Sequence, residues 1–116
     1  MAKIEKFEDI IVWQKSRVLV ADIYSICRLL RDYSFKDQIQ RAAISIMNNI
    51  AEGYERKGNK EFIKFLYIAK GSCAEVRSML YLALGLKYIG KKEFDDLYAK
   101  SIEISKMISG FIKTLC

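Results

Sequence analysis

The chain has 116 residues, among them 20 Lys or Arg and 14 Asp or Glu, which gives a formal net charge of +6. This length suits one domain, residues 1–116, with its own hydrophobic core. Proline is absent and glycine is sparse, so the composition favours an all-α protein over turn-rich β architectures. The lack of histidine excludes a histidine general base and the Glu-x-x-His metal sites of helical bundles.

The first expected helix covers about residues 8–31. Its apolar and small side chains recur at alternating steps of three and four, the heptad pattern of a bundle helix. Those positions are Trp13, Ser16, Val20, Ile23, Cys27 and Leu30. A second apolar line beside the first consists of Val12, Leu19 and Ile26. Two lines predict two neighbouring helices.

The second expected helix runs from about residue 34 to 57, since Ser34 and Asp37 resemble a capping box with the shorter acid. Gly53 weakens its last turns by about 1 kcal/mol relative to alanine, so a kink or an early end there is an alternative. One face is apolar and consists of Ile39, Ala42, Ala43, Ile46 and Ile50. The opposite side is a polar line of Arg41, Ser45, Asn49, Glu52 and Arg56.

Two further helices complete the pattern. Gly58 reads as a helix stop and Asn59 as the N-cap of a helix over about residues 60–88. Its heptad positions are Phe62, Leu66, Ala69, Cys73, Val76, Leu80 and Ala83. Apolar residues on its other sides predict that it is central or buried by other subunits. The last helix follows Gly90, runs from residue 91 to about 115, and has heptad positions Phe94, Leu97, Ser101, Ile104, Ile108, Phe111 and Leu115.

Four helices with short connections predict an antiparallel up-down-up-down four-helix bundle. The polar line of the second helix then has two interpretations. Gly71, Ser72 and Glu75 can face Asn49, Ser45 and Arg41 across the hairpin, with small residues allowing close approach. Such a buried network has to be fully hydrogen-bonded and would fix the register of the two helices. The alternative is a ligand site.

Cations crowd the hairpin between the second and third helices. They are Arg56, Lys57, Lys60 and Lys64, with Tyr54 beside them. Four cations next to an aromatic ring can hold a phosphate backbone and stack a base. Arg41 and Lys70 are expected as secondary phosphate contacts. The alternative is a solvated bundle end that is neutralised in part by Glu55 and Glu61.

Catalysis and membrane insertion find little support in the sequence. No phosphate-binding GxxxxGK[ST] loop or GxSxG motif is present, and carboxylates such as Glu52, Glu55 and Glu75 are typical of solvated helix faces. We therefore expect neither an enzyme nor a bound metal or cofactor.

The longest uncharged run, residues 78–86, is about half the length of a membrane span, and no signal peptide is evident. Cys27, Cys73 and Cys116 lack metal-site spacing and are expected to be reduced thiols of a cytoplasmic protein.

Three segments resemble a known family. They are FEDIIVW (residues 7–13), QRAAISIMNNIAEGYER (residues 40–56) and EFIKFLYIAKGSCAE (residues 61–75). Together they are similar to bacterial four-helix-bundle proteins first noticed as products of intervening sequences in 23S ribosomal RNA genes. That family resembles the accessory variability determinant protein of diversity-generating retroelements. The chain differs at Met47, where the family commonly has proline, and in residues 31–36, which lack the family's usual proline and acidic residues.

The resemblance implies a homopentameric ring of bundles with a non-catalytic role in nucleic-acid binding. By position, the family's motif residues are Arg41, Ser45, Asn49, Glu52, Gly53, Arg56, Gly71, Ser72 and Glu75. We therefore expect an oligomeric accessory protein that binds nucleic acid, with RNA as the first candidate. The alternative is a scaffold that docks a partner protein and binds no nucleic acid.

Overall fold

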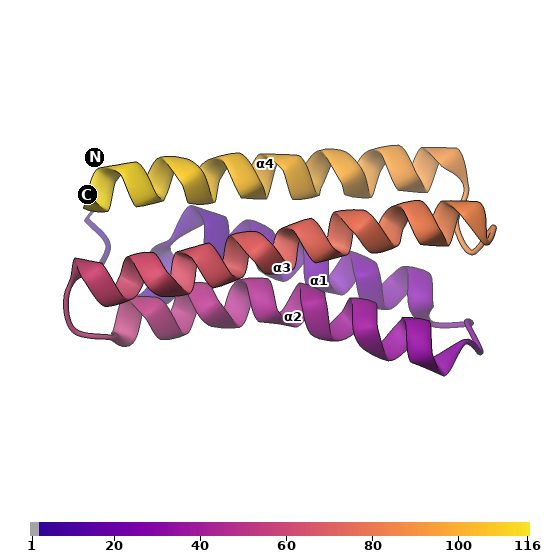
Figure 1. The fold of residues 1–116 in the computed structure, drawn as a ribbon, viewed down its shortest axis with the longest axis horizontal. Helices are drawn as coiled ribbons and strands as arrows, with labels where there is room; N and C mark the ends of the chain where they lie inside the picture. The colour runs from indigo at the N-terminus through magenta and orange to yellow at the C-terminus, as the bar shows by residue number, and fades with distance from the viewer. Residues whose placement is uncertain (1–2) are drawn as a thin grey trace.

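The computed structural model describes residues 3–116 as a bundle of four long helices (Figure 1). The elements are η1 (Phe7–Asp9), α1 (Ile11–Cys27), α2 (Tyr33–Glu55), α3 (Asn59–Gly85) and α4 (Lys91–Leu115). The helices alternate in direction, each packs on its neighbours in sequence, and α1 closes onto α4. The predicted up-down-up-down four-helix bundle is confirmed. The bundle is 43 Å long, with the α2–α3 hairpin at one end and the α1–α2 and α3–α4 connections at the other.

The start of α2 differs from the prediction. Asp32 is the N-cap, and its Oδ1 accepts a hydrogen bond from the Phe35 backbone N–H at 3.1 Å. The predicted Ser34–Asp37 capping box is therefore wrong, because Asp37 instead binds Arg41 one turn further along the helix. An aspartate two residues earlier already satisfies an N–H of the first turn, so α2 begins at Tyr33.

The two ends of α3 also depend on local backbone geometry. Gly58, with φ of 85°, is the N-cap in place of the predicted Asn59. The Asn59 amide instead donates to the Leu115 carbonyl at 3.3 Å. At the other end the helix stops at Gly85, three residues early, since Lys87 adopts φ of 63° and the Tyr88 N–H bonds back to the Ala83 carbonyl at 2.9 Å.

The core matches the predicted apolar face of α2 and the predicted heptad positions of α3, where every one of these residues is buried. In α1 the buried stripe is displaced by part of a turn and consists of Val12, Ser16, Leu19, Ile23 and Cys27. Trp13 and Val20 are only half-buried. In α4, Ile112 is buried in place of Phe111. The sequence therefore identified the core-facing side of each helix, with an error of one position in α1 and α4.

Gly53 lies at a point where α2 and α3 approach each other closely. It is buried within α2, and a Cβ added there would lie 2.6 Å from Phe65 Cβ and 2.9 Å from Phe62 Cδ1. α2 continues through Gly53 to Glu55, so the alternative of a helix end at Gly53 is wrong. Glycine at this position serves helix packing, since any side chain would push the two helices apart.

Part of the predicted polar network joins the same two helices. Ser45 Oγ and Ser72 Oγ lie 2.7 Å apart across the hairpin. The Asn49 amide donates to Ser45 Oγ at 2.9 Å and to the Ser45 carbonyl at 2.8 Å. These groups are half-buried and mutually hydrogen-bonded, so they fix the register of α2 against α3, and no buried side-chain nitrogen or oxygen of the described residues lacks a partner.

We predict that Gly53→Ala lowers the free energy of unfolding by about 1–3 kcal/mol, because its methyl group overlaps Phe62 and Phe65. Gly110→Ala in α4 is the matched control, since a Cβ there meets no atom within 4 Å. The control is expected to be neutral or to gain up to about 1 kcal/mol. Urea unfolding followed by circular dichroism measures both, and a Gly53→Ala variant as stable as the parent would contradict the packing argument.

We also predict a coupling free energy of about 0.5–1.5 kcal/mol between Ser45 and Ser72. The measurement is a double-mutant cycle of Ser45→Ala, Ser72→Ala and the double variant, with stability taken from urea unfolding. Ser78→Ala, at an exposed position of α3, should change stability by less than about 0.5 kcal/mol. Strictly additive effects of Ser45→Ala and Ser72→Ala would show that the hydroxyl pair does not stabilise the register.

Candidate nucleic-acid interface

The α2–α3 hairpin brings the four predicted cations to one end of the bundle. We call Arg56, Lys57, Lys60 and Lys64 the hairpin cluster. Gly58 reverses the chain between α2 and α3 through its positive φ, so that residues from both helix ends come together. All four residues are exposed to solvent. The predicted basic end is therefore present at the surface.

Two members of the hairpin cluster are paired with carboxylates. Arg56 Nη2 lies 3.0 Å from Glu52 Oε1, and its guanidinium lies 4.9 Å from the centre of the Phe65 ring. Lys64 Nζ lies 3.3 Å from Glu61 Oε2. The solvated, salt-bridged interpretation is thus correct for half of the cluster, although Glu52 rather than Glu55 is the partner of Arg56.

The other two members, Lys57 and Lys60, have no carboxylate within ion-pair distance in residues 3–116. Their ammonium groups are exposed, which leaves them available to an external anion. Arg56 adds a guanidinium that Glu52 and Phe65 hold in one orientation. Such a guanidinium loses less conformational entropy on binding phosphate than a mobile side chain does. These three side chains are the most suitable phosphate contacts of the hairpin cluster.

Tyr54 does not provide the stacking surface that its position suggested. Its ring packs edge-on against Phe62, with centroids 6.0 Å apart, and its hydroxyl donates to the Ile4 carbonyl at 3.2 Å. The residue is half-buried and holds the start of the described chain onto the hairpin. The hairpin cluster is therefore an electrostatic surface without an exposed aromatic platform from Tyr54.

The predicted secondary contacts, Arg41 and Lys70, lie away from the hairpin cluster. Arg41 is fifteen residues before Arg56 on α2, about 22 Å along the helix axis. It is exposed and forms an ion pair with Asp37 at 2.9 Å. Lys70 is ten residues beyond Lys60 on α3, about 15 Å along its axis, and is half-buried. The structure does not bring either residue into the cluster.

The remaining motif residues have different roles from those expected. Arg41 pairs with Asp37 rather than with Glu75, since a carboxylate one turn away on the same helix is already within reach. Glu75 is exposed and forms no ion pair with any described residue. Gly71 faces outward, where an added Cβ would meet nothing within 4 Å, so it is not a close-approach residue. The network across the hairpin is limited to Ser45, Asn49 and Ser72.

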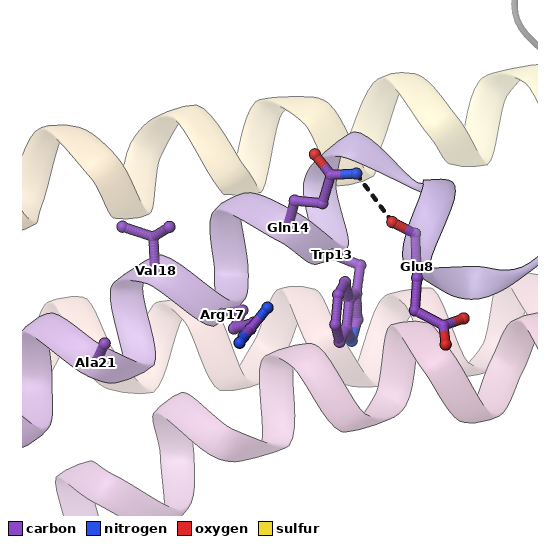
Figure 2. A pocket seen from close by; sticks show the side chains of 6 residues that line it. All are labelled: Glu8, Trp13, Gln14, Arg17, Val18 and Ala21. Atoms are coloured by element: carbon purple, nitrogen blue, oxygen red, sulfur yellow. Dashed lines mark hydrogen bonds between the residues drawn. The ribbon is translucent and has the colours of Figure 1, made fainter.

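An open hollow of about 540 Å³ beside α1 was not anticipated from the sequence. Figure 2 shows Trp13 and Arg17 lying side by side along this hollow, while Gln14 turns toward η1. The Gln14 amide donates to the Glu8 carbonyl at 2.8 Å. The Trp13 ring packs edge-on against the Phe7 ring, with ring centroids 5.1 Å apart. The heptad pattern predicts Trp13 as a core residue, and nothing in that pattern distinguishes its half-buried position. The hollow has no nucleophile–base pair, and its charged groups are Glu8 and Arg17.

The described residues offer little for metal or thiol chemistry. No group of three His, Cys, Asp or Glu side chains among them is arranged to hold a metal ion. Cys27, Cys73 and Cys116 are free thiols. Burial raises the pKa of the Cys27 and Cys73 thiols, which keeps them protonated and unreactive in the core. In residues 3–116, no helix is long and apolar enough to cross a membrane.

Comparisons with known proteins agree with this arrangement. Residues 8–110 match the family described as 23S rRNA-intervening sequence protein. No curated protein matches the chain. The chain is also similar to a crystal structure of a protein of unknown function from the S23 ribosomal protein family of Bacteroides thetaiotaomicron VPI-5482. The TM-score is 0.83 and the identity 27%, over 89% of this chain and 99% of that one. Since the match spans all four helices, the chain belongs to the 23S rRNA-intervening sequence protein family.

Proposed function

We propose that this chain is a non-enzymatic accessory protein that binds nucleic acid, with RNA as its ligand, through the hairpin cluster. The observation that supports this proposal is the pair of exposed lysines, Lys57 and Lys60, which have no carboxylate partner in the part of the chain that the structure describes. Arg56 lies beside them with its guanidinium orientation fixed. Cations arranged in this way contact the phosphate backbone and do not read bases.

RNA is the preferred ligand class because the family is named for an intervening sequence in 23S rRNA. The net charge of +6 supports attraction to any polyanion. In this proposal Arg41 and Lys70 contact phosphates further along the bundle. Because both residues are distant from the hairpin, the ligand has to extend along the side of the bundle. Binding is then weakly selective for sequence and strongly dependent on salt.

We further propose that the chain assembles with copies of itself, as a ring of five in keeping with the family resemblance. The outward face of α3 supports this, because Tyr67, Ile68, Leu82 and Leu86 are each about half exposed on it. Large apolar side chains along one helix face favour burial against another surface. A ring would repeat the hairpin cluster on every subunit and raise avidity without a strong single site.

The alternative is a scaffold that docks a partner protein. The same apolar face of α3 favours it, since a partner protein could cover that face in place of another copy. In that case the basic surface would steer association rather than bind nucleic acid.

We predict that Lys57→Ala/Lys60→Ala binds a structured RNA roughly tenfold more weakly than the parent at low salt. The expected loss in the slope of log affinity against log salt is about 1.4 to 1.8, for two lost phosphate contacts. The measurement is filter binding over a KCl series. The matched control, Arg17→Ala/Lys106→Ala, removes two exposed cations outside the hairpin and should bind like the parent. No retention of RNA by the parent, or equal losses in both variants, would refute the hairpin site.

A further inference from the structure

The end of the bundle opposite the hairpin is formed by two connections that are far apart in the sequence. The α1–α2 and α3–α4 connections lie at this end (Figure 1, right). Tyr88 Oη donates to Asp32 Oδ2 at 2.7 Å, and the Tyr88 ring packs edge-on against Phe35 with centroids 5.2 Å apart. These contacts join residues 28–36 and 86–92 into one surface, which we call the tip.

The tip is more positive than the hairpin. It contains six cations and one carboxylate, Asp32. The cations are Arg28, Arg31, Lys36, Lys87, Lys91 and Lys92. Residues 53–64, which form the hairpin, contain four cations and two carboxylates. The tip therefore has a formal charge of +5 against +2 for the hairpin.

Most of this charge is not neutralised within the described residues. Lys91 pairs with Asp95 at 3.0 Å, and the other five cations form no ion pair there. Asp32 stays ionised, because hydrogen bonds from Tyr88 and the Phe35 N–H lower its pKa. Both of its oxygens are engaged in those bonds, so it remains a structural contact between the two connections.

Two apolar side chains project from the same tip. Leu29 is 88% exposed and Tyr33 is 71% exposed, the highest values among the large hydrophobic residues that the structure describes. Both lie between tip cations in sequence, with Arg28 and Arg31 on either side of Leu29. An exposed aromatic ring among unpaired cations is the arrangement by which proteins bind single-stranded nucleic acid: the ring stacks a base and the cations contact phosphates.

We propose that the tip binds an unpaired segment of nucleic acid, with phosphates on its unpaired cations and a base stacked on Tyr33. A duplex fits this surface less well, since its base faces are already stacked and cannot reach the ring. The inference rests on the proposed function for its ligand class, but it assigns a separate site. The bundle is 43 Å long, so the tip and the hairpin cluster would contact different parts of one RNA.

The test uses fluorescence anisotropy with two labelled probes of about 12 nucleotides per strand: an unstructured single-stranded RNA and an RNA duplex. Tyr33→Ala is expected to weaken binding of the single strand at least about fivefold and of the duplex less than about twofold. Tyr24→Ala, at a 44% exposed tyrosine of α1 outside the tip, is the matched control and should change neither. Arg31→Ala/Lys87→Ala/Lys92→Ala should lower the salt slope for the single strand by about 2, for three lost phosphate contacts.

The outcomes separate this proposal from the hairpin site. If the tip variants bind the single strand like the parent while Lys57→Ala/Lys60→Ala binds weakly, the tip proposal is wrong and the hairpin site stands. Weak binding by the tip variants alone supports the tip and refutes the hairpin site. A parent that binds neither probe refutes both. Cosedimentation with phosphatidylserine vesicles that is lost in the tip variants, without any effect of those variants on RNA binding, would overturn the proposal in favour of a lipid surface.

Discussion

The close contact of α2 with α3 at Gly53 is the constraint on which the positions of the other groups depend. Because no Cβ separates the helices there, the backbone of α2 approaches Phe62 and Phe65 directly. That approach lets Ser45 and Ser72 meet at hydrogen-bond distance further along the same pair of helices. The hairpin itself is short because Gly58 reverses the chain between the end of α2 and the start of α3, so the cations of both helix ends lie on one surface. Gly53 thus links core packing and helix register.

Five of the seven ion pairs in residues 3–116 join residues three or four apart in sequence, and the other two, Lys15 with Glu103 and Lys100 with Asp22, join α1 to α4. Arg41 with Asp37, Arg56 with Glu52 and Lys91 with Asp95 are all pairs four residues apart. Such pairs need no ordering of distant segments, whereas an ion pair between helices competes only when its geometry is already fixed. Lys57 and Lys60 form no ion pair in residues 3–116, so they are left for external ligands. This distinguishes the useful part of a basic patch from the part that is already neutralised.

The elongated bundle has a basic surface at each end, and these two surfaces are the basis of the RNA binding that we propose. The hairpin cluster offers phosphate contacts with a fixed guanidinium, and the tip adds an exposed tyrosine among unpaired cations. The apolar outer face of α3 lies between the two ends and is suited to burial against another subunit or a partner.

The sequence by itself determined the four helices, their core-facing sides in α2 and α3, and the presence of the hairpin cluster. Each of these depends on residues within a few turns of one another, where helical periodicity and turn chemistry act locally. The tertiary structure alone decided that Gly53 is a packing residue rather than a helix breaker, and that Arg41 does not reach Glu75. It also decided that the Tyr54 ring packs against Phe62 and that its hydroxyl donates to the Ile4 carbonyl, so Tyr54 is not free to stack a base. The charge of individual segments does not reveal the tip, because its cations belong to two connections more than fifty residues apart. Tyr88 joins these connections through its contacts with Asp32 and Phe35.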